Sequence, residues 1–251
     1  MRVCTTASKQ GLAEYGHRWL DGRAYWPAGT EFWLYQESYV VPYTPEEQQM
    51  IAQAGCGNIA CWLDRRDILV LKEFVEWRAK YIGYIAPDYR FDVVKFAHKV
   101  FAAADAFYDY DGIGVWTDAD LVTFAQIPDG LIEKQVEDAY LACYQRTGLY
   151  TETGLWIMDC SHPEHRNFLD YWRQLYLTDR FKGLAQWVDC MTLDATIRHF
   201  GDKIKINNLS GEYSRHMHPQ AMTELGKYCD HAKGNRKIAG VSPENKQREA
   251  A

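Results

Sequence analysis

Strand-like segments alternate with stretches of helical periodicity in the first third of the chain. Residues Arg2 to Thr6 predict a short strand, and apolar residues at helical spacing from Ala7 to Leu20 predict a helix after it. Residues Glu31 to Gln36 predict a second strand, which follows the turn residues 27–29. Helical spacing returns from Thr44 to about Lys80, so we expect these helices to cover one face of a sheet.

The middle of the chain continues this alternation. Residues Phe91 to Ala106 have helical spacing and lead into an apolar strand from Ile113 to Trp116. A further short strand is expected from Leu121 to Phe124, and a helix from Leu131 to Arg146. Strands that alternate with helices in this way are typical of an open α/β sheet.

The last third predicts two more strands and ends in a polar tail. A strand is expected at Leu155 to Met158, an amphipathic helix begins near Pro163, and another strand is expected at Lys203 to Ile206. We expect a single domain over residues 1–240. The polar residues 241–251 predict a disordered tail.

Composition and charge narrow the class of protein. With 251 residues and 47% hydrophobic residues, the chain can bury one substantial core. Its net charge of −6 provides no global positive field for nucleic acid or an anionic membrane, although a local basic patch stays open. Its 7 cysteines lack the paired spacing of zinc sites and predict reduced thiols. Because no segment is long and apolar enough to cross a bilayer, we expect a cytoplasmic protein without membrane association.

Two Asp-x-Asp triplets lie within a dozen residues, at Asp109 and Asp111 and at Asp118 and Asp120. The second pair ends an apolar strand, and residues two apart on a strand point to the same side. Both carboxylates can therefore address one cation at the end of the sheet, and Mg²⁺ or Mn²⁺ prefers such oxygen ligands together with substrate phosphates. The alternative is a turn with no ligand. The first pair precedes the strand and is interpreted as a turn.

A second candidate element lies late in the chain, from His231 to Lys237. An imidazole can complete a metal site, Gly234 allows the backbone to approach a phosphate, and three cations offer donors to phosphate oxygens: Lys233, Arg236 and Lys237. The alternative is a solvated basic stretch that contains an incidental histidine.

Together, the strand, the residues WTDAD, a mid-chain Thr-Gly-Leu segment and the late His-x-Lys-Gly-x-x-Lys resemble the retaining GT-A glycosyltransferases related to glycogenin and bacterial galactosyltransferases. The resemblance implies a Rossmann-like mixed sheet flanked by helices and a nucleotide-diphosphate sugar as donor, with a UDP-sugar foremost. It implies that Asp118, Asp120 and His231 bind Mn²⁺ or Mg²⁺, and that Lys233 or Lys237 contacts the donor phosphates beside Gly234. The late segment lacks the Pro-Trp ending of the family motif.

The chain also resembles small bacteriophage glycosyltransferases, some relatives of which attach sugars to hydroxylated pyrimidines in viral DNA. This resemblance adds modified DNA as an acceptor class and the cytoplasm of a host cell as the location. Lys99 and the basic residues near the C-terminus would then form a local strip for phosphates.

Further candidates follow from the same resemblance. Thr5 and Thr6 stand where the predicted first strand gives way to the loop that holds the base or ribose in such folds, and Ser8 is either a third polar contact or a helix N-cap. Arg90 and Lys95 are candidates for contacts to the donor, and the alternative is that both are ordinary surface charges. Asp189 is the candidate catalytic carboxylate beside the sugar, and it also suits the N-cap of the helix that follows.

Two other functional classes stay open. A nucleotidyltransferase uses a similar sheet and paired carboxylates, but the segment after the first strand lacks its glycine-rich signature. A non-enzymatic binding module would use Asp118 and Asp120 as a turn only. The remaining histidine pairs are interpreted as surface or loop residues, because no cysteine or carboxylate stands at ligand spacing beside them: His162 with His165, and His216 with His218.

Overall fold

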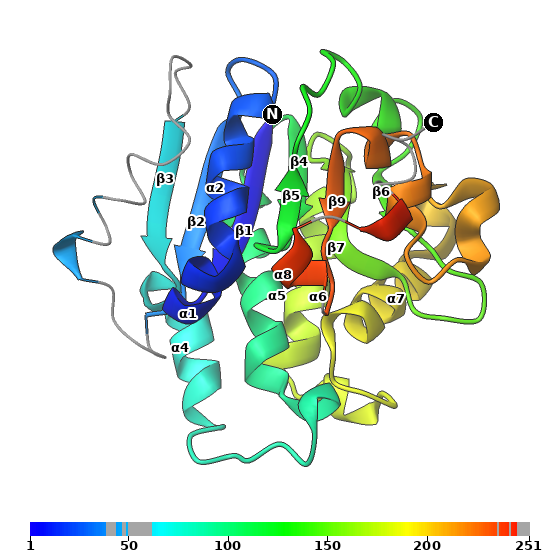
Figure 1. Cartoon of the computed structure of the whole chain (residues 1–251). Helices are drawn as coiled ribbons and strands as arrows, with labels where there is room; N and C mark the ends of the chain where they lie inside the picture. The colour runs from blue at the N-terminus through cyan, green and yellow to red at the C-terminus, as the bar shows by residue number, and fades with distance from the viewer. Residues whose placement is uncertain (39–43, 47–48, 50–61, 235, 241, 245–251) are drawn as a thin grey trace.

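The computed structural model describes residues 1–38, 44–46, 49, 62–234, 236–240 and 242–244. A seven-stranded sheet forms its centre, in the order β3-β2-β1-β4-β7-β6-β8 (Figure 1). Strands β3, β2, β1 and β4 run parallel, whereas β7 is antiparallel to both of its neighbours and β6 pairs with β8 in parallel. The strand bounds are β1 Arg2–Ala7, β2 Glu31–Gln36, β3 Trp62–Asp67, β4 Ile113–Thr117, β6 Leu141–Tyr144, β7 Glu152–Asp159 and β8 Ile206–Asn208.

Helices cover both faces of this sheet. The described α-helices are α1 Lys9–Gly11, α2 His17–Gly22, α4 Lys72–Ala79, α5 Val93–Phe107, α6 His165–Leu177, α7 Asp189–Phe200 and α8 Arg236–Ala239. A π-helical turn at Leu12–Gly16 joins α1 to α2. A separate two-stranded sheet pairs β5, Leu121–Thr123, with β9, Cys229–His231, and so joins the middle of the chain to its C-terminal part.

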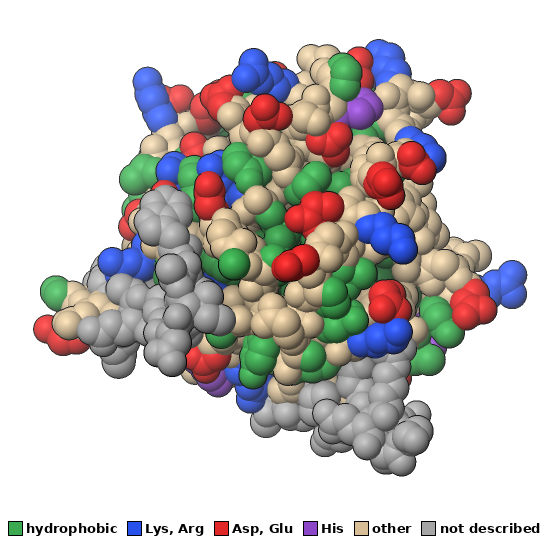
Figure 2. Space-filling model, turned by 90° about the horizontal axis from the view of Figure 1, so that it is seen from above, with side chains coloured by type: hydrophobic (Ala, Val, Ile, Leu, Met, Phe, Trp, Pro, Cys, Tyr) green, Lys and Arg blue, Asp and Glu red, His purple; other side chains and the backbone are tan. Residues whose placement is uncertain are grey.

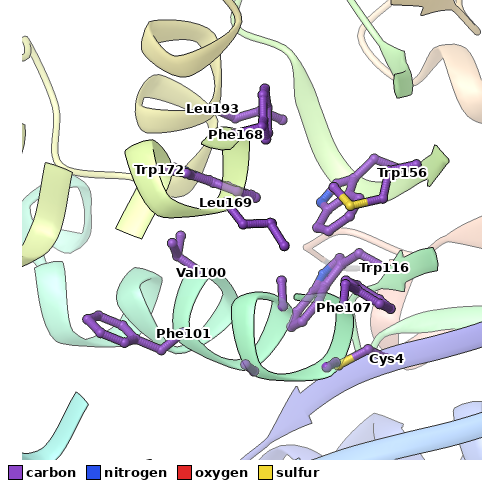
Figure 3. Close-up of a cluster of buried hydrophobic side chains, with 14 of the residues drawn as sticks. Cys4, Val100, Phe101, Phe107, Trp116, Trp156, Phe168, Leu169, Trp172 and Leu193 are labelled. Carbon is purple, nitrogen blue, oxygen red and sulfur yellow. The ribbon is translucent and has the colours of Figure 1, made fainter. Parts of the chain in front are cut away.

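Successive residues of each central strand enter opposite cores, as the pleat of a strand requires. Trp116 of β4 and Trp156 of β7 stack at 6.0 Å on the face beneath α5 and α6, where Trp172 packs against Trp156 (Figure 3). Their neighbours Val115 and Ile157 point into the second core, beneath α2. The sheet is therefore buried on both sides, which fixes the positions of its strand ends.

The structure confirms most of the predicted elements in the first and middle parts of the chain. The strands at Arg2–Ala7, Glu31–Gln36 and Ile113–Thr117, and the helix at Val93–Phe107, lie where the pattern places them. The predicted strand at 155–158 is longer, at Glu152–Asp159. The strand predicted at 203–206 begins only at Ile206, because residues 201–203 form a 3₁₀ turn.

Two helix predictions are wrong. The helical stretch predicted up to Lys80 contains strand β3, which pairs in parallel with β2, so that Leu63 lies opposite Phe32. Because β3 is an edge strand, its charged residues 64–67 can reach solvent, and this hides the strand pattern. The later part of that prediction is confirmed by α4, and most of its earlier part, residues 47–48 and 50–61, lies outside the described residues.

The second error concerns residues 131–146, where a helix was predicted. A 3₁₀ turn at Glu133–Val136 leads instead into strand β6, which lies between β7 and β8. The four residues of β6 are all buried, two on each side of the sheet. A short run that is apolar on both faces has no period that distinguishes strand from helix.

The surface carries charges of both signs. Figure 2 shows Lys and Arg interspersed with Asp and Glu on the face that it presents.

The cysteines that the structure describes hold free thiols: Cys4, Cys143, Cys160, Cys190 and Cys229. The other two, Cys56 and Cys61, lie outside the described residues. Among the described residues, no helix combines the length and the apolar character needed to cross a membrane.

Part of the predicted tail is described. The backbone N–H of Ser242 donates to Asp230 Oδ2 at 2.9 Å, and Arg236 pairs with Glu244 at 3.1 Å. Residues 245–251 lie outside the described residues, so the domain boundary at 240 and the disorder of the tail stay predictions.

Candidate metal and nucleotide site

Asp118 and Asp120 lie in the tight turn that joins β4 to β5. They follow β4 rather than extend it, and the turn is closed by the hydrogen bond from Leu121 N–H to the Asp118 carbonyl at 2.9 Å. The indole N–H of Trp116 donates to Asp118 Oδ1 at 2.8 Å and holds that carboxylate. The pair therefore lies in a turn, as the alternative interpretation expected, and its binding of a cation stays a prediction.

His231 comes from β9, more than a hundred residues later in the chain. The antiparallel register of β5 and β9 places His231 opposite Leu121, directly after the acidic turn. His231 Nε2 lies 2.8 Å from Asp120 Oδ1 and 3.6 Å from Asp118 Oδ2. One ligand atom from each of these three residues lies within 4.8 Å of the others, the grouping that a bound metal ion requires.

The other side of the His231 ring rests on the start of β7. Its Nδ1 lies 3.2 Å from Glu152 Oε1. Gly154 lies beneath the ring, and a Cβ at that position would be 1.9 Å from Nδ1. The Gly154 carbonyl also accepts the backbone N–H of Asp118 at 2.8 Å, so β7 holds both the imidazole and the acidic turn.

A second network connects Lys99 of α5 to Asp189 at the start of α7. The buried Lys99 ammonium pairs with Asp118 Oδ1 at 2.7 Å and with the Asp189 carboxylate, and it donates to the Thr153 carbonyl at 2.9 Å. The Thr153 hydroxyl donates to Asp189 Oδ2 at 2.8 Å. Four elements distant in the sequence, α5, the turn after β4, β7 and α7, therefore meet at one ammonium group.

Both late lysines reach this region. Lys237 Nζ lies 2.8 Å from Asp120 Oδ2 and 4.4 Å from the centre of the Tyr15 ring. Tyr15 lies in the π-helical turn after β1, beside α8 (Figure 1). Lys233 Nζ instead pairs with Glu152 Oε2 at 2.5 Å.

The charges in the site shift one another's pKa values. Burial alone would lower the pKa of His231, but Asp120 and Glu152 outweigh it and raise that pKa to about 10. Burial would raise the pKa of Asp120, and the neighbouring His231 and Lys237 lower it instead. The pKa of Asp189 is lowered because the charge of Lys99 exceeds the effect of burial. While no cation is bound, these ion pairs favour the charged form of each of these groups.

The two threonines predicted after the first strand lie within it. Thr5 and Thr6 belong to β1, which ends at Ala7 and is parallel to β4, and Thr5 is fully buried whereas Thr6 is partly exposed. Ser8 caps the helix, because its hydroxyl accepts the Gly11 N–H at 3.1 Å.

The basic residues that were predicted to contact the donor lie in different parts of the structure. The exposed Arg90 pairs with Asp88 at 2.9 Å, and Lys95 is an exposed residue in the first turn of α5. Gly234 has a φ of 57°, a left-handed conformation that favours glycine. Arg236 contacts Ser242 and Glu244 rather than the acidic turn.

The sequence analysis did not place three of these residues in the site. Glu152 and Tyr15 were not considered, and Lys99 was assigned to a strip for DNA phosphates, which its burial contradicts because its ammonium faces Asp118 and Asp189. A charged residue within a buried helix face or at the start of an apolar strand is the signal that could have found Lys99 and Glu152.

Asp109 and three histidines that were not predicted as metal ligands make other contacts. Asp109 precedes β4 and pairs with Arg166 at 2.8 Å. His165 is buried against the Phe107 carbonyl, so it is a core residue rather than a surface one. His162 and His216 each accept a local backbone N–H.

No protein-family model and no curated protein matches this sequence. Among solved structures, the galactosyltransferase LgtC in complex with donor and acceptor sugar analogues aligns with a TM-score of 0.55 at 12% identity, over 94% of this chain and 88% of LgtC. The bifunctional glycosyltransferase WbbM aligns with a TM-score of 0.52 at 9% identity, over 78% of this chain. The chain has the GT-A fold.

In this GT-A sheet, the acidic turn follows β4, and β1 ends beside it. Ligands of open α/β sheets bind at the edge where parallel strands end. The aligned region spans 37% of WbbM, so the likeness to that protein concerns one part of it. At these identities the likeness establishes the fold, and the chemistry has to be argued from the site.

Proposed function

We propose that this chain is a metal-dependent glycosyltransferase that moves a sugar from a nucleotide-diphosphate sugar to an acceptor hydroxyl. The observation that carries the proposal is the convergence of Asp118, Asp120 and His231 at the strand-end edge of a GT-A sheet. LgtC, which has the same fold, was solved with donor and acceptor sugar analogues. This likeness supports the class of reaction and leaves the donor sugar to experiment.

The three side chains suit a divalent cation. Asp120 Oδ1 is buried and, among the described residues, has no hydrogen bond of good geometry, although His231 Nε2 lies 2.8 Å away. Two carboxylates and an imidazole suit Mn²⁺, and Mg²⁺ would rely mainly on the carboxylates and on phosphate oxygens. A cation bound there would neutralise the charge that develops on the leaving diphosphate.

Lys237 and Tyr15 border the same position from the opposite side. Lys237 Nζ contacts Asp120 and is half-buried, so a short movement would bring it onto a donor phosphate. Lys233 forms an ion pair with the buried Glu152, so Lys237 is the lysine that we expect to contact the donor phosphates. Near the end of β1, Thr6 is partly exposed and Thr5 is fully buried, so base and ribose would contact Thr6, and UDP is the first nucleotide to test.

Asp189 is the proposed catalytic carboxylate. Lys99 and the Thr153 hydroxyl hold it ionised in a buried position next to the acidic turn. An ionised carboxylate at that position can orient an acceptor hydroxyl or stabilise positive charge at the sugar carbon. Lys99 keeps the Asp189 and Asp118 carboxylates together while the donor reacts.

The acceptor would approach past the segment before Asp189. Tyr84 stacks on Trp187 at 6.0 Å, and Tyr89 is 70% exposed. The backbone N–H of Trp187 donates to the Arg90 carbonyl at 2.8 Å, which joins these two loops. Exposed aromatic rings suit sugars and nucleobases alike. Hydroxylated pyrimidines in DNA and saccharides are therefore the two acceptor classes to test.

Nucleotide binding with and without Mn²⁺ tests the donor site. UDP, GDP, CDP and TDP are titrated calorimetrically into the wild type and into Asp118→Ala/Asp120→Ala. The first Asp-x-Asp triplet of the same chain provides a matched control, Asp109→Ala/Asp111→Ala. We expect one diphosphate to bind only with Mn²⁺, to be lost in the first variant and to be retained in the control.

Other outcomes identify the rival functions. If the folded wild type binds no diphosphate, the glycosyltransferase proposal fails and a binding module is favoured. Release of pyrophosphate from a nucleoside triphosphate would identify a nucleotidyltransferase. Transfer of labelled sugar onto DNA that contains hydroxymethylpyrimidine, compared with unmodified DNA and with free saccharides, then identifies the acceptor.

A further inference from the structure

Glu152 is a buried carboxylate with three kinds of partner. It is 4% exposed and begins β7. Its Oε1 faces His231 Nδ1 at 3.2 Å and accepts the Gly154 N–H at 3.1 Å. Its Oε2 pairs with Lys233 at 2.5 Å and with Arg146 at 3.7 Å. A buried carboxylate with this many partners holds one orientation.

The His231 ring lies between two sets of carboxylates. Nδ1 faces Glu152, whereas Nε2 faces Asp120 and Asp118. An imidazole that binds a metal through one nitrogen usually donates its other N–H to a carboxylate or carbonyl, which fixes both the tautomer and the ring orientation. Glu152 occupies the place of that second partner.

Gly154 makes this arrangement sterically available. Strand residues two apart point to the same side, so Glu152 and Gly154 face His231 together while Thr153 faces Asp189. The absence of a side chain at Gly154 lets the ring lie against β7 with Nδ1 next to the carboxylate. The sequence Glu-Thr-Gly therefore serves the imidazole on one face and the catalytic carboxylate on the other.

We propose that Glu152 is a positioning residue that directs His231 Nε2 toward the cation site, and that Lys233 and Arg146 serve to neutralise Glu152. The inference rests on the proposed metal site. It adds a residue that acts through His231 and touches neither the cation nor the donor. It also assigns Lys233 a role that the late sequence segment did not suggest.

Calorimetric titration with Mn²⁺ alone tests the inference. We expect Glu152→Ala to weaken Mn²⁺ binding by about 10- to 100-fold, the usual effect of losing such a partner. Glu152→Gln keeps an oxygen that can accept the Nδ1 proton, so we expect it to recover part of the loss. Glu31→Gln is the matched control, because Glu31 also begins a strand and pairs with Arg2 at 2.9 Å away from the site.

A spectroscopic measurement separates positioning from a structural role. Long-range ¹⁵N–¹H spectra of the imidazoles are recorded with Zn²⁺, which is diamagnetic and binds imidazole nitrogen. They report which nitrogen of His231 carries the proton, and the signal is assigned by its loss in His231→Gln. We expect the Nδ1–H form in the wild type and a mixture of the two forms in Glu152→Ala. Thermal unfolding identifies a variant that fails to fold, and Glu152→Gln then carries the test.

The outcomes distinguish this inference from the proposed function. If the wild type binds Mn²⁺ and Asp118→Ala/Asp120→Ala does not, the metal site stands. An affinity of a folded Glu152→Ala within about threefold of the wild type, or an unchanged tautomer, would then overturn the role of Glu152 alone. If the wild type binds no Mn²⁺, the metal site itself fails and this inference fails with it.

Discussion

Gly154 and His231 are in contact across the site, and the missing side chain of the glycine is what makes room for the imidazole. A Cβ on Gly154 would lie 1.9 Å from His231 Nδ1, a separation that two non-hydrogen atoms reach only when they are bonded. His231 is itself held by the pairing of β9 with β5. A side chain at position 154 must therefore displace the imidazole or separate β9 from the sheet.

We expect Gly154→Ala to weaken Mn²⁺ binding by at least about 10-fold, since the ring can no longer face Asp120. Gly183→Ala is the matched control, because nothing lies within 4 Å of a Cβ at that position. Calorimetry on both variants provides the measurement. Equal Mn²⁺ affinities in the two variants would show that His231 is not a ligand.

The two late lysines should differ in what their loss affects. Lys237→Ala is expected to weaken metal-dependent diphosphate binding by about 10-fold, the equivalent of one charge-assisted hydrogen bond. Lys233→Ala should instead lower the free energy of unfolding by about 1–3 kcal/mol, because it removes a cation from the buried Glu152. Calorimetry with the diphosphate and urea unfolding measure the two effects. A reversal of this pattern would assign the phosphate to Lys233.

Lys99 is expected to stabilise the fold as well as the site. Lys99→Met keeps the length of the side chain but leaves Asp189 buried without its cation, which should cost about 3 kcal/mol in urea unfolding. Lys95→Met, one turn earlier on α5 and exposed, should change stability by less than about 0.5 kcal/mol. Similar unfolding midpoints for the two variants would contradict this role of Lys99.

His165 should make the fold sensitive to acid. Burial lowers its pKa, and its Nε2–H donates to the Phe107 carbonyl at 2.8 Å, so it is neutral in the folded protein. The unfolded chain binds a proton at this residue below a pH of about 6.5. Its contribution to stability is thus complete above that pH and is lost as the pH falls toward the folded pKa, by at most about 1.4 kcal/mol per pH unit.

Urea unfolding between pH 7.5 and pH 5 checks this expectation. The wild type should lose more stability over this range than His165→Gln, which has no group to titrate at this position. Subtracting the two curves removes the contribution of the carboxylates that both proteins share. Parallel curves would show that His165 is protonated equally in the folded and unfolded states.

Local patterns in the sequence were sufficient for much of the fold. The strand at Glu31–Gln36 and the helix at Val93–Phe107 have a clear period, and the structure confirms them. The period fails at β3, an edge strand rich in charge, and at β6, a short strand buried on both faces. In both cases the neighbouring strand supplies the hydrogen bonds and burial that decide the structure, and no local pattern contains that information.

The site shows the same division. The sequence by itself determined the acidic turn at Asp118 and Asp120, because both carboxylates belong to one short segment after an apolar strand. It also selected His231 and Asp189 by resemblance. Only the tertiary structure decided that Lys237 rather than Lys233 faces Asp120, and that Glu152 lies behind His231. These contacts join residues about 80 to 120 positions apart, and they depend on the register of β5 with β9 and on the packing of β7, which arise only when the whole sheet forms.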